Sequence, residues 1–340
     1  MKASRLLEGR TDAVVEELPD PVAGSGCVVV RVEAAFMPPY IGDLVAGKFP
    51  ITPARPFTTG HCAVGVVESV GPDADDSLAG RRVYCDMYLE SPGIGARREY
   101  GFIGCFGPWP ESMRLLARWP NGSLAERVLL PEECVVPVPA EVTVAPAVLC
   151  RLGWLGTACA GLVRGGFTPG TRVAIGGATG LLGTSAVLVA LAMGAGEVVV
   201  SGRRSHIVEE LAALDRRVLP DDGDREIDLV LECSAGPDTG RTAAYLGRLT
   251  RNGALVIVGE LEAALPVDPA LLMPADLAVR GSFWFPRGMP ARLLRLVAAG
   301  ALDLSGIEAE VYPLAEVNAA LHRIRAGSGG LRHVAVACDG

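Results

Sequence analysis

The turn from Gly176 to Gly183, which reads G-G-A-T-G-L-L-G, has residue types and spacing suited to binding a dinucleotide. Small residues let the turn close and let the backbone approach a pyrophosphate, whose charge then lies at the positive N-terminus of the next helix. Such a turn can also be tight packing alone, but here it lies between an expected strand and an expected helix. The pattern therefore predicts cofactor contacts from Ala178, Thr179, Gly180, Leu181, Leu182 and Gly183.

A second signal lies about twenty residues further on, where the next expected strand ends at S-G-R-R, residues 201 to 204. An NAD site places a carboxylate there for the ribose 2′-hydroxyl. This stretch has no acid and offers Ser201, Arg203 and Arg204 instead. Arginine forms charge-assisted bonds to a phosphate worth roughly 1.5 to 3 kcal/mol each. The sequence therefore predicts NADPH as the cofactor. The alternative is that the two arginines are solvated surface charges, Arg204 more so than Arg203.

The elements that must hold these loops change character near residue 145. Before it, short β-branched runs at 28–32, 64–70 and 127–130 lie between Pro and Gly residues, which indicates an antiparallel, barrel-like unit. After it, strands alternate with helices, as in a doubly wound parallel sheet. From about residue 288 a helix, a polar stretch and a last strand, H-V-A-V-A, follow. We therefore expect an α/β protein with two domains.

Length, composition and charge support a two-domain soluble enzyme. The 340 residues exceed the roughly 250 to 300 at which single cores usually divide. A net charge of −8 with dispersed basic residues argues against nucleic acid as a partner. Nine cysteines without a C-x-x-C pair argue against a disulfide framework or a four-thiolate zinc site. The first ten residues lack a signal-peptide core, and the apolar run from Leu181 is short for a membrane span, so we expect a cytoplasmic protein with no membrane partner.

Four segments together resemble the medium-chain dehydrogenase/reductase superfamily, in particular its zinc-free quinone and enoyl reductase-like branch. They are G-H-C-A-V-G-V-V-E-S-V-G at 60–71, N-G-S-L-A-E-R-V at 121–128, the A-T-G-L-L-G turn, and A-E-V-Y-P-L-A-E-V-N-A-A-L near the end. The resemblance implies a GroES-like β-barrel catalytic domain (1–150), a Rossmann NADP-binding domain (151–285) and a C-terminal segment (286–340) that returns to the catalytic domain. It also implies an active site in the cleft.

The resemblance also bears on metal binding, because Tyr40, Asp43 and His61 keep the family spacing around its catalytic zinc. In the zinc enzymes a cysteine ligand lies three residues before the aspartate and twenty-one before the histidine ligand. Tyr40 occupies that cysteine's position, and Cys150 falls about two residues out of register with the third ligand. A catalytic zinc needs about three such ligands and an open position. We therefore expect no metal.

Without a Lewis acid, hydrogen-bond donors must stabilise the negative oxygen that follows hydride transfer. The resemblance makes Tyr40 and His61 the donor candidates, with Asp43 orienting His61. The alternatives are that Tyr40 lines the pocket, that His61 has no catalytic role, and that solvent supplies the proton. The stretch 86–120 departs most from the family, and we expect it to set substrate selectivity. Tryptophans such as Trp109 could shape that pocket or fill the core.

The resemblance places further cofactor contacts along the chain. Thr157 corresponds to the threonine beside the nicotinamide, and Arg332 lies near the position of a pyrophosphate contact. Residues 278–285, A-V-R-G-S-F-W-F, resemble the edge strand through which such proteins dimerise, so we expect a homodimer. The positions where backbone groups line the cofactor are Ser234, Val258, Gly259, Phe283 and Trp284.

These observations favour an NADPH-dependent oxidoreductase that transfers hydride to a small-molecule substrate without zinc. The substrate would be an activated C=C bond of enone, quinone or enoyl type, or a related carbonyl or imine. Two alternatives stay open: a zinc-dependent alcohol dehydrogenase or ketone reductase that uses His61 and Cys150, and an NADPH-binding sensor or partner subunit without turnover.

Overall fold

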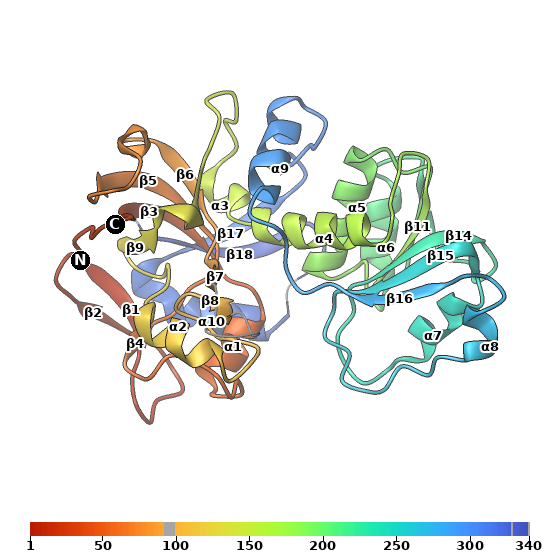
Figure 1. Cartoon of the computed structure of the whole chain (residues 1–340), viewed down its shortest axis with the longest axis horizontal. Coiled ribbons are helices and arrows are strands. Elements are labelled where there is room, and N and C mark those ends of the chain that lie inside the picture. Colours follow the sequence, from red (N-terminus) through yellow and green to blue (C-terminus); the bar gives the residue numbers. More distant parts are fainter. Residues whose placement is uncertain (92–98, 328, 339–340) are drawn as a thin grey trace. The chain divides into compact units, whose positions relative to one another are not determined.

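The computed structural model describes residues 1–91, 99–327 and 329–338, and the chain divides into two compact units (Figure 1). Unit 1 comprises Met1–Leu152, Ile307–Ser328 and Arg332–Gly340, and unit 2 comprises Gly153–Gly306 and Gly329–Leu331. Each unit therefore contains segments that are far apart in the sequence.

A β-sheet centred on β3 (Cys27–Phe36) organises unit 1. β3 pairs antiparallel with β5 (Ala63–Val70), β9 (Arg127–Pro131) and β18 (Arg332–Ala337), and the described strands follow the order β10-β6-β5-β3-β18-β17. Val28, Val30 and Val32 of β3 are all fully buried, as suits a strand in the middle of a barrel-like sheet. The last strand of the chain thus completes a sheet begun near its start.

Smaller elements surround this sheet in unit 1. β1 pairs with β2 and β4, β7 pairs with β8, helix α2 packs on β8, and α1 packs on α10. The strands are β1 (Lys2–Leu6), β2 (Val14–Glu17), β4 (Phe57–Thr58), β6 (Arg82–Cys85), β7 (Tyr88–Ser91), β8 (Glu99–Phe102), β10 (Val135–Pro137) and β17 (Glu308–Pro313). The helices are α1 (Tyr40–Val45), α2 (Ser112–Arg118), α3 (Pro146–Leu149) and α10 (Val317–Arg325), with 3₁₀ turns at Asp76–Leu78, Glu132–Cys134 and Leu314–Glu316.

Unit 2 is a parallel sheet with strand order β13-β12-β11-β14-β15-β16. The order reverses at β11, which lies beside both β12 and β14, as in the doubly wound Rossmann arrangement. The strands are β11 (Arg172–Gly176), β12 (Glu197–Val200), β13 (Val218–Pro220), β14 (Ile227–Glu232), β15 (Leu249–Ile257) and β16 (Ala278–Gly281). The helices are α4 (Leu152–Arg164), α5 (Leu181–Ala192), α6 (Ser205–Ala212), α7 (Gly240–Leu246), α8 (Pro269–Leu272) and α9 (Met289–Ala298). Both expected domain types, and the α/β class, are therefore present.

The core of unit 2 forms where the sheet meets its helices. Ala174, Val199, Val230 and Leu255 are fully buried on neighbouring strands, and Tyr245 of α7 packs with them. Helix α5 is also mostly buried, which explains the apolar run from Leu181 as a core helix. Another stretch, Pro146–Arg164, is long and apolar enough to cross a membrane, yet about 72% of it is buried inside the fold, as is common in core helices.

The boundary expected near residue 285 is wrong, because unit 2 continues to Gly306. Phe285 packs closely on Gly156 of α4, where any side chain would overlap its ring. The amphipathic helix α9 then buries Leu293 and Leu294. Leu302 is buried as well, so the chain leaves unit 2 only after this apolar segment is covered.

A buried basic pair lies where α3 meets β18 in unit 1. Arg151 and His333 are almost fully buried, and the Nε2 of His333 lies 2.8 Å from the carbonyl oxygen of Ala147. Burial lowers the pKa of His333 to about 3, and the positive charge of Arg151 adds to this effect. Burial also lowers the pKa of Arg151 to about 9, which leaves its guanidinium charged at pH 7. His333 is therefore neutral in the folded protein across the physiological range.

This burial predicts a specific acid sensitivity. Because the pKa of His333 is about 3 when folded and about 6.5 when unfolded, the unfolded chain binds the extra proton between these values. Stability should fall as pH falls from about 6.5 towards 3, by a few kcal/mol in total. The His333→Gln variant, which keeps a donor for Ala147, should show a shallower decline in urea-unfolding free energy over this range. An equally steep decline in the variant would contradict the assignment.

Candidate functional site

The turn between β11 and α5 in unit 2 forms a cradle for a nucleotide phosphate. Gly177 has a positive φ of 67°, which favours glycine, and a side chain at Gly183 would overlap the carbonyl of Gly177. The backbone N–H of Gly180 donates to Gly177 at 2.9 Å, and the hydroxyl of Thr184 donates to the carbonyl of Ala178 at 2.9 Å. The twelve-residue helix α5 begins directly after this turn. Its N-terminal N–H groups therefore lie beside glycine backbone that carries no side chains, an arrangement that suits phosphate binding.

A buried carboxylate, Glu232 at the end of β14, joins helix α7 and the loops that follow β14 and β15. Its two carboxylate oxygens accept hydrogen bonds from the N–H of Ser234 (2.9 Å) and the hydroxyl of Thr242 (2.7 Å). Its carbonyl oxygen accepts from the N–H groups of Val258 and Gly259, both at 2.9 Å. The carboxylate also fills the space where Gly176 would carry a side chain. Sequence reasoning missed Glu232, although an acid that ends an apolar strand, D-L-V-L-E, could have marked it.

The loop after β12 lies against the same turn. The N–H of Ala178 donates to the carbonyl of Ser201 at 2.8 Å, and the Ser201 hydroxyl is 2.8 Å from that of Tyr245. Arg203 is exposed. Arg204 behaves differently, because its guanidinium donates to the carbonyl of Thr179 inside the cofactor turn.

Arg204 is therefore not a solvated charge, and its guanidinium is directed at the turn itself. The N–H of Gly330 donates to the same carbonyl of Thr179, at 3.0 Å. Gly329 packs so closely on Arg204 that a side chain there would overlap the guanidinium. We interpret Arg204 as a residue that stabilises the turn at 176–183. Arg203 is then the arginine that we expect to bind a ribose 2′-phosphate.

The other expected cofactor residues occupy varied environments. Thr157 is buried in α4, and its hydroxyl donates to the carbonyl of Gly153 at 2.9 Å. Phe283 is 45% exposed, whereas Trp284 is buried and stacked on Phe285 at 4.5 Å. Arg332 begins β18 in unit 1, where it pairs with Glu308 of β17 at 2.8 Å.

The candidate chemistry of unit 1 lies where α1 and the β4–β5 connection meet. Two prolines precede Tyr40, which is the first residue of α1, and this favours helix initiation there. His61 lies just before β5, and its carbonyl accepts a hydrogen bond from the hydroxyl of Ser123 at 2.6 Å. Gly60, with a φ of 151°, leaves no room for a side chain against the backbone of Ser123. This close contact fixes the backbone of His61.

Tyr40 and His61, which the family resemblance named as donor candidates, are in direct contact through their rings. Their ring centroids are 5.6 Å apart at an interplanar angle of 81°. His61 is fully buried, and burial lowers its pKa to about 3. Burial raises the pKa of the Tyr40 phenol well above its usual range, and the nearby thiols of Cys105 and Cys62 add to this. Both side chains are therefore neutral at pH 7.

Asp43 does not take the expected part in this arrangement. Its carboxylate lies 2.7 Å from the ammonium of Lys48, and both side chains are at least half exposed. His61, by contrast, is fully buried. The prediction that Asp43 orients His61 is wrong, because the carboxylate of Asp43 pairs with Lys48 at the surface instead.

The residues of unit 1 do not fit a catalytic zinc. The ring of Tyr40, rather than a soft ligand, stands beside His61, and burial raises the pKa of Cys150, whose thiol donates to the carbonyl of Ala147 at 3.1 Å. Over residues 1–91, 99–327 and 329–338, no group of three His, Cys, Asp or Glu side chains is placed to hold a metal ion. Zinc chemistry needs about three such ligands.

Aromatic rings that sequence reasoning missed surround this pair. Phe49 and Phe106 stack at 4.5 Å, and both approach Tyr40, at 6.4 and 5.7 Å. Phe102 lies 4.9 Å from His61. The repeated aromatics of the divergent 86–120 stretch were the available signal, but only the fold brings them to Tyr40.

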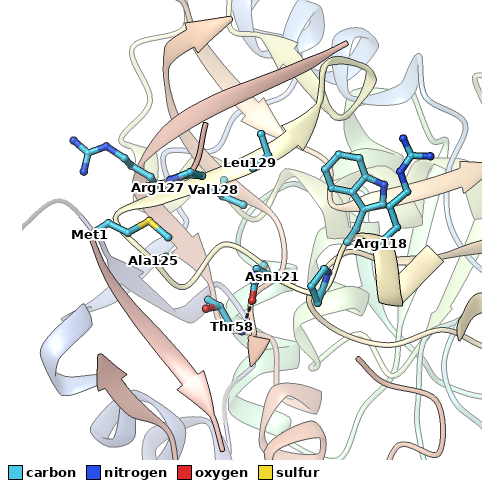
Figure 2. Close-up of a pocket in the computed structure, with 12 residues that line it drawn as sticks. Met1, Thr58, Arg118, Asn121, Ala125, Arg127, Val128 and Leu129 are labelled. Carbon is cyan, nitrogen blue, oxygen red and sulfur yellow. Dashed lines mark hydrogen bonds between the residues drawn. The ribbon is translucent and has the colours of Figure 1, made fainter. Parts of the chain in front are cut away.

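A separate cavity of about 210 Å³ opens in unit 1 (Figure 2). Thr58, Arg118, Asn121 and Arg127 line it, and the amide oxygen of Asn121 accepts from the N–H of Thr58 at 2.9 Å. Its lining, as far as the structure describes the chain, includes neither Tyr40, His61 nor the surrounding rings. We assign no chemistry to it.

A barrel-like unit with a buried polar pair, joined in one chain to a Rossmann sheet with a phosphate turn, defines an oxidoreductase that uses a nicotinamide dinucleotide. Comparison with known proteins agrees. Residues 24–140 match the alcohol dehydrogenase GroES-like domain. An alcohol dehydrogenase from Moraxella sp. (strain TAE123) is 28% identical over 344 residues, which covers 96% of each chain. The chain is thus similar to oxidoreductases of the medium-chain dehydrogenase/reductase superfamily.

Solved structures share the whole fold. A thermostable alcohol dehydrogenase from Pyrobaculum aerophilum has a TM-score of 0.80 and 25% identity over 99% of both chains, and it has also been solved with cobalt and zinc bound. A dehydrogenase from Sinorhizobium meliloti 1021, solved with NADP, has a TM-score of 0.82 and 24% identity over 99% of this chain and 98% of its own. Alcohol dehydrogenases are prominent among the relatives, so membership of the zinc-free branch stays a prediction.

The contrast between Arg203 and Arg204 predicts two different binding defects. Arg203→Ala should weaken NADPH binding about 10- to 100-fold and leave NADH binding nearly unchanged, because only NADPH carries the 2′-phosphate. Arg204→Met should weaken both cofactors by similar factors, because it loosens the turn that both need. Fluorescence titration of each variant with each cofactor measures this. A loss confined to NADPH in Arg204→Met would instead make Arg204 a phosphate ligand.

Proposed function

We propose that this protein is an NADPH-dependent reductase of an activated C=C bond, or of a related carbonyl or imine, that works without catalytic zinc. The observation that carries the proposal is the Tyr40–His61 contact, with ring centroids 5.6 Å apart and the imidazole fully buried. The family resemblance assigns a metal ligand to the position of this phenol. The donor set around His61, which does not fit zinc, supports it.

The cofactor turn of unit 2 would hold the nucleotide. Gly180 and Gly183 allow its phosphates to approach the helix N-terminus, Ser234 and Gly259 line the adjoining loops, and exposed Arg203 favours a 2′-phosphate. When bound there, a nicotinamide cofactor supplies the hydride.

Tyr40 and His61 would stabilise the substrate oxygen that gains negative charge. A neutral phenol and a neutral imidazole each offer one hydrogen-bond donor, and in dry surroundings such a donor is worth more than in water. The raised pKa of Tyr40 keeps its hydroxyl protonated and donating, but makes it a poor acid. We therefore propose that Tyr40 holds the oxygen while water delivers the proton to carbon.

Conjugate reduction suits this arrangement better than alcohol oxidation does. In an enone or quinone the charge spreads over the conjugated system, so ordinary donors suffice. Oxidation of an alcohol first requires removal of its proton, which favours a metal or a base. A histidine whose pKa is about 3 is a weak base at pH 7.

We also propose that the protein is a cytoplasmic homodimer. β16 (Ala278–Gly281) is the last strand at one side of the unit 2 sheet, and parts of it are exposed. Such an edge can pair with a second copy. Light scattering coupled to size exclusion should give twice the 35.4 kDa chain mass. A monomer at micromolar concentration would reject the dimer.

The reductase proposal predicts how the two donors contribute. Tyr40→Phe should lower kcat for an enone about 10- to 100-fold without weakening NADPH binding, because one oxyanion donor is lost while the ring remains. His61→Gln, which keeps a neutral donor, should lose less activity than His61→Leu. NADPH oxidation with a panel of enones, quinones, imines and aldehydes measures both.

Metal analysis supplies the control for this experiment. Protein purified with and without 1,10-phenanthroline should have equal kcat values and well below one zinc per chain. A stoichiometric zinc, with activity lost on chelation, would replace the proposal by the alcohol dehydrogenase alternative. NADPH binding without turnover on any acceptor would favour a sensor.

A further inference from the structure

Seven aromatic side chains of unit 1 form a continuous series of contacts, which we call the aromatic wall. The chain has only four Trp, six Tyr and eight Phe residues, so this is a marked concentration. The wall consists of Tyr40, Phe49, Tyr88, Tyr100, Phe102, Phe106 and Trp109.

The wall extends well beyond Tyr40. From the Phe49–Phe106 stack, Phe102 continues it at 5.1 Å from Phe106, and Tyr88 lies 5.4 Å from Phe102. Tyr100 follows at 6.1 Å from Tyr88. At the end, the indole N–H of Trp109 donates to the hydroxyl of Tyr100. These centroid separations lie within the 4.5 to 7 Å range of favourable ring pairs.

The wall contains both buried and partly exposed rings. Phe102 is 2% exposed and lies against the fully buried His61. Phe49, Phe106 and Tyr88 are partly exposed, as are Tyr40 and Tyr100, and Trp109 is 57% exposed. Rings held by other rings from behind present fixed surfaces, which makes them suitable for stacking on a flat ligand.

The wall is built of side chains without a formal charge, and burial keeps the adjacent His61 neutral. Among the described charged residues near it, Asp43 pairs with Lys48 at 2.7 Å, Glu99 pairs with Arg114 at 3.4 Å, and the buried carboxylate of Asp86 accepts from the N–H of Tyr88 at 3.1 Å. A neutral conjugated ring would lose little by leaving water to lie on such rings, whereas a charged group would lose its hydration.

We propose that the aromatic wall binds a flat, uncharged ring system of the substrate, an aryl or other conjugated ring attached to the group that is reduced. This rests on the reductase activity proposed above and assigns its substrate class. Tyr40 belongs both to the wall and to the donor pair, so a ring stacked beside it places the attached conjugated oxygen within reach of a donor. Phe49 and Phe106 are then specificity-determining residues for the ring.

The test compares two enones that differ only in their ring. 4-Phenyl-3-buten-2-one should have a kcat/KM about 10-fold higher than 4-cyclohexyl-3-buten-2-one, mostly through KM, because planar stacking favours the aryl group. Phe106→Leu should reduce this preference to about 2-fold or less. Phe167→Leu removes a half-buried ring from unit 2 and should keep the full preference. Equal kcat/KM values for the two enones in the unmodified protein, or a Phe106→Leu variant that loses both substrates equally, would overturn the proposal.

A binding measurement separates failure of the wall from failure of the reductase proposal. Titration of the protein with either enone, in the presence of NADP⁺ so that no turnover occurs, should show about 10-fold tighter binding of the phenyl compound, lost in Phe106→Leu. This preference without NADPH oxidation on any acceptor would support the wall and reject the reductase. Turnover of enones without ring preference in binding or kcat/KM would reject the wall and leave the reductase in place.

Discussion

The burial of His61 against the ring of Tyr40 is the condition on which the chemistry proposed for unit 1 depends. In water an imidazole would be protonated part of the time near neutral pH, and a phenol would be a weak donor among many. Here burial lowers the pKa of His61 to about 3 and raises that of Tyr40, so each side chain stays in one protonation state. The ring of Phe102 packs on His61, and the backbone contact at Gly60 fixes the position of His61.

The cofactor turn of unit 2 depends on glycines that allow close packing. Gly176 leaves space for the carboxylate of Glu232, and Gly183 leaves space for the carbonyl of Gly177. Glu232 then binds the adjoining loop through Ser234 and helix α7 through Thr242. A single buried carboxylate and a few glycines thus determine the shape of this turn, and we propose that Arg203 selects the ligand.

The features that could be predicted from the sequence are those formed by residues close together in the chain. The turn at 176–183 and the change from barrel to alternating strands both depend on residues close in sequence, and the structure has them as expected. Asp43 was misplaced because its carboxylate pairs with Lys48 at the surface, a contact that the spacing from Tyr40 and to His61 does not reveal. The partner of Arg204 and the rings around Tyr40 and His61 could not be predicted, because residue 106 meets residue 40, and residue 102 meets residue 61, only through sheet pairing and turns.

The short segment Gly329–Leu331 has a consequence for any attempt to study the nucleotide-binding unit alone. It belongs to unit 2, although the chain on either side belongs to unit 1. Its Gly330 N–H supplies one of the two donors to the carbonyl of Thr179. A fragment spanning 153–306 would contain every strand of the parallel sheet and still lack this tie. A fragment cut at these limits would therefore lack the hydrogen bond from Gly330 to the turn at 176–183. Transfer of residues 153–306 as one block to another protein during evolution would lose the same hydrogen bond.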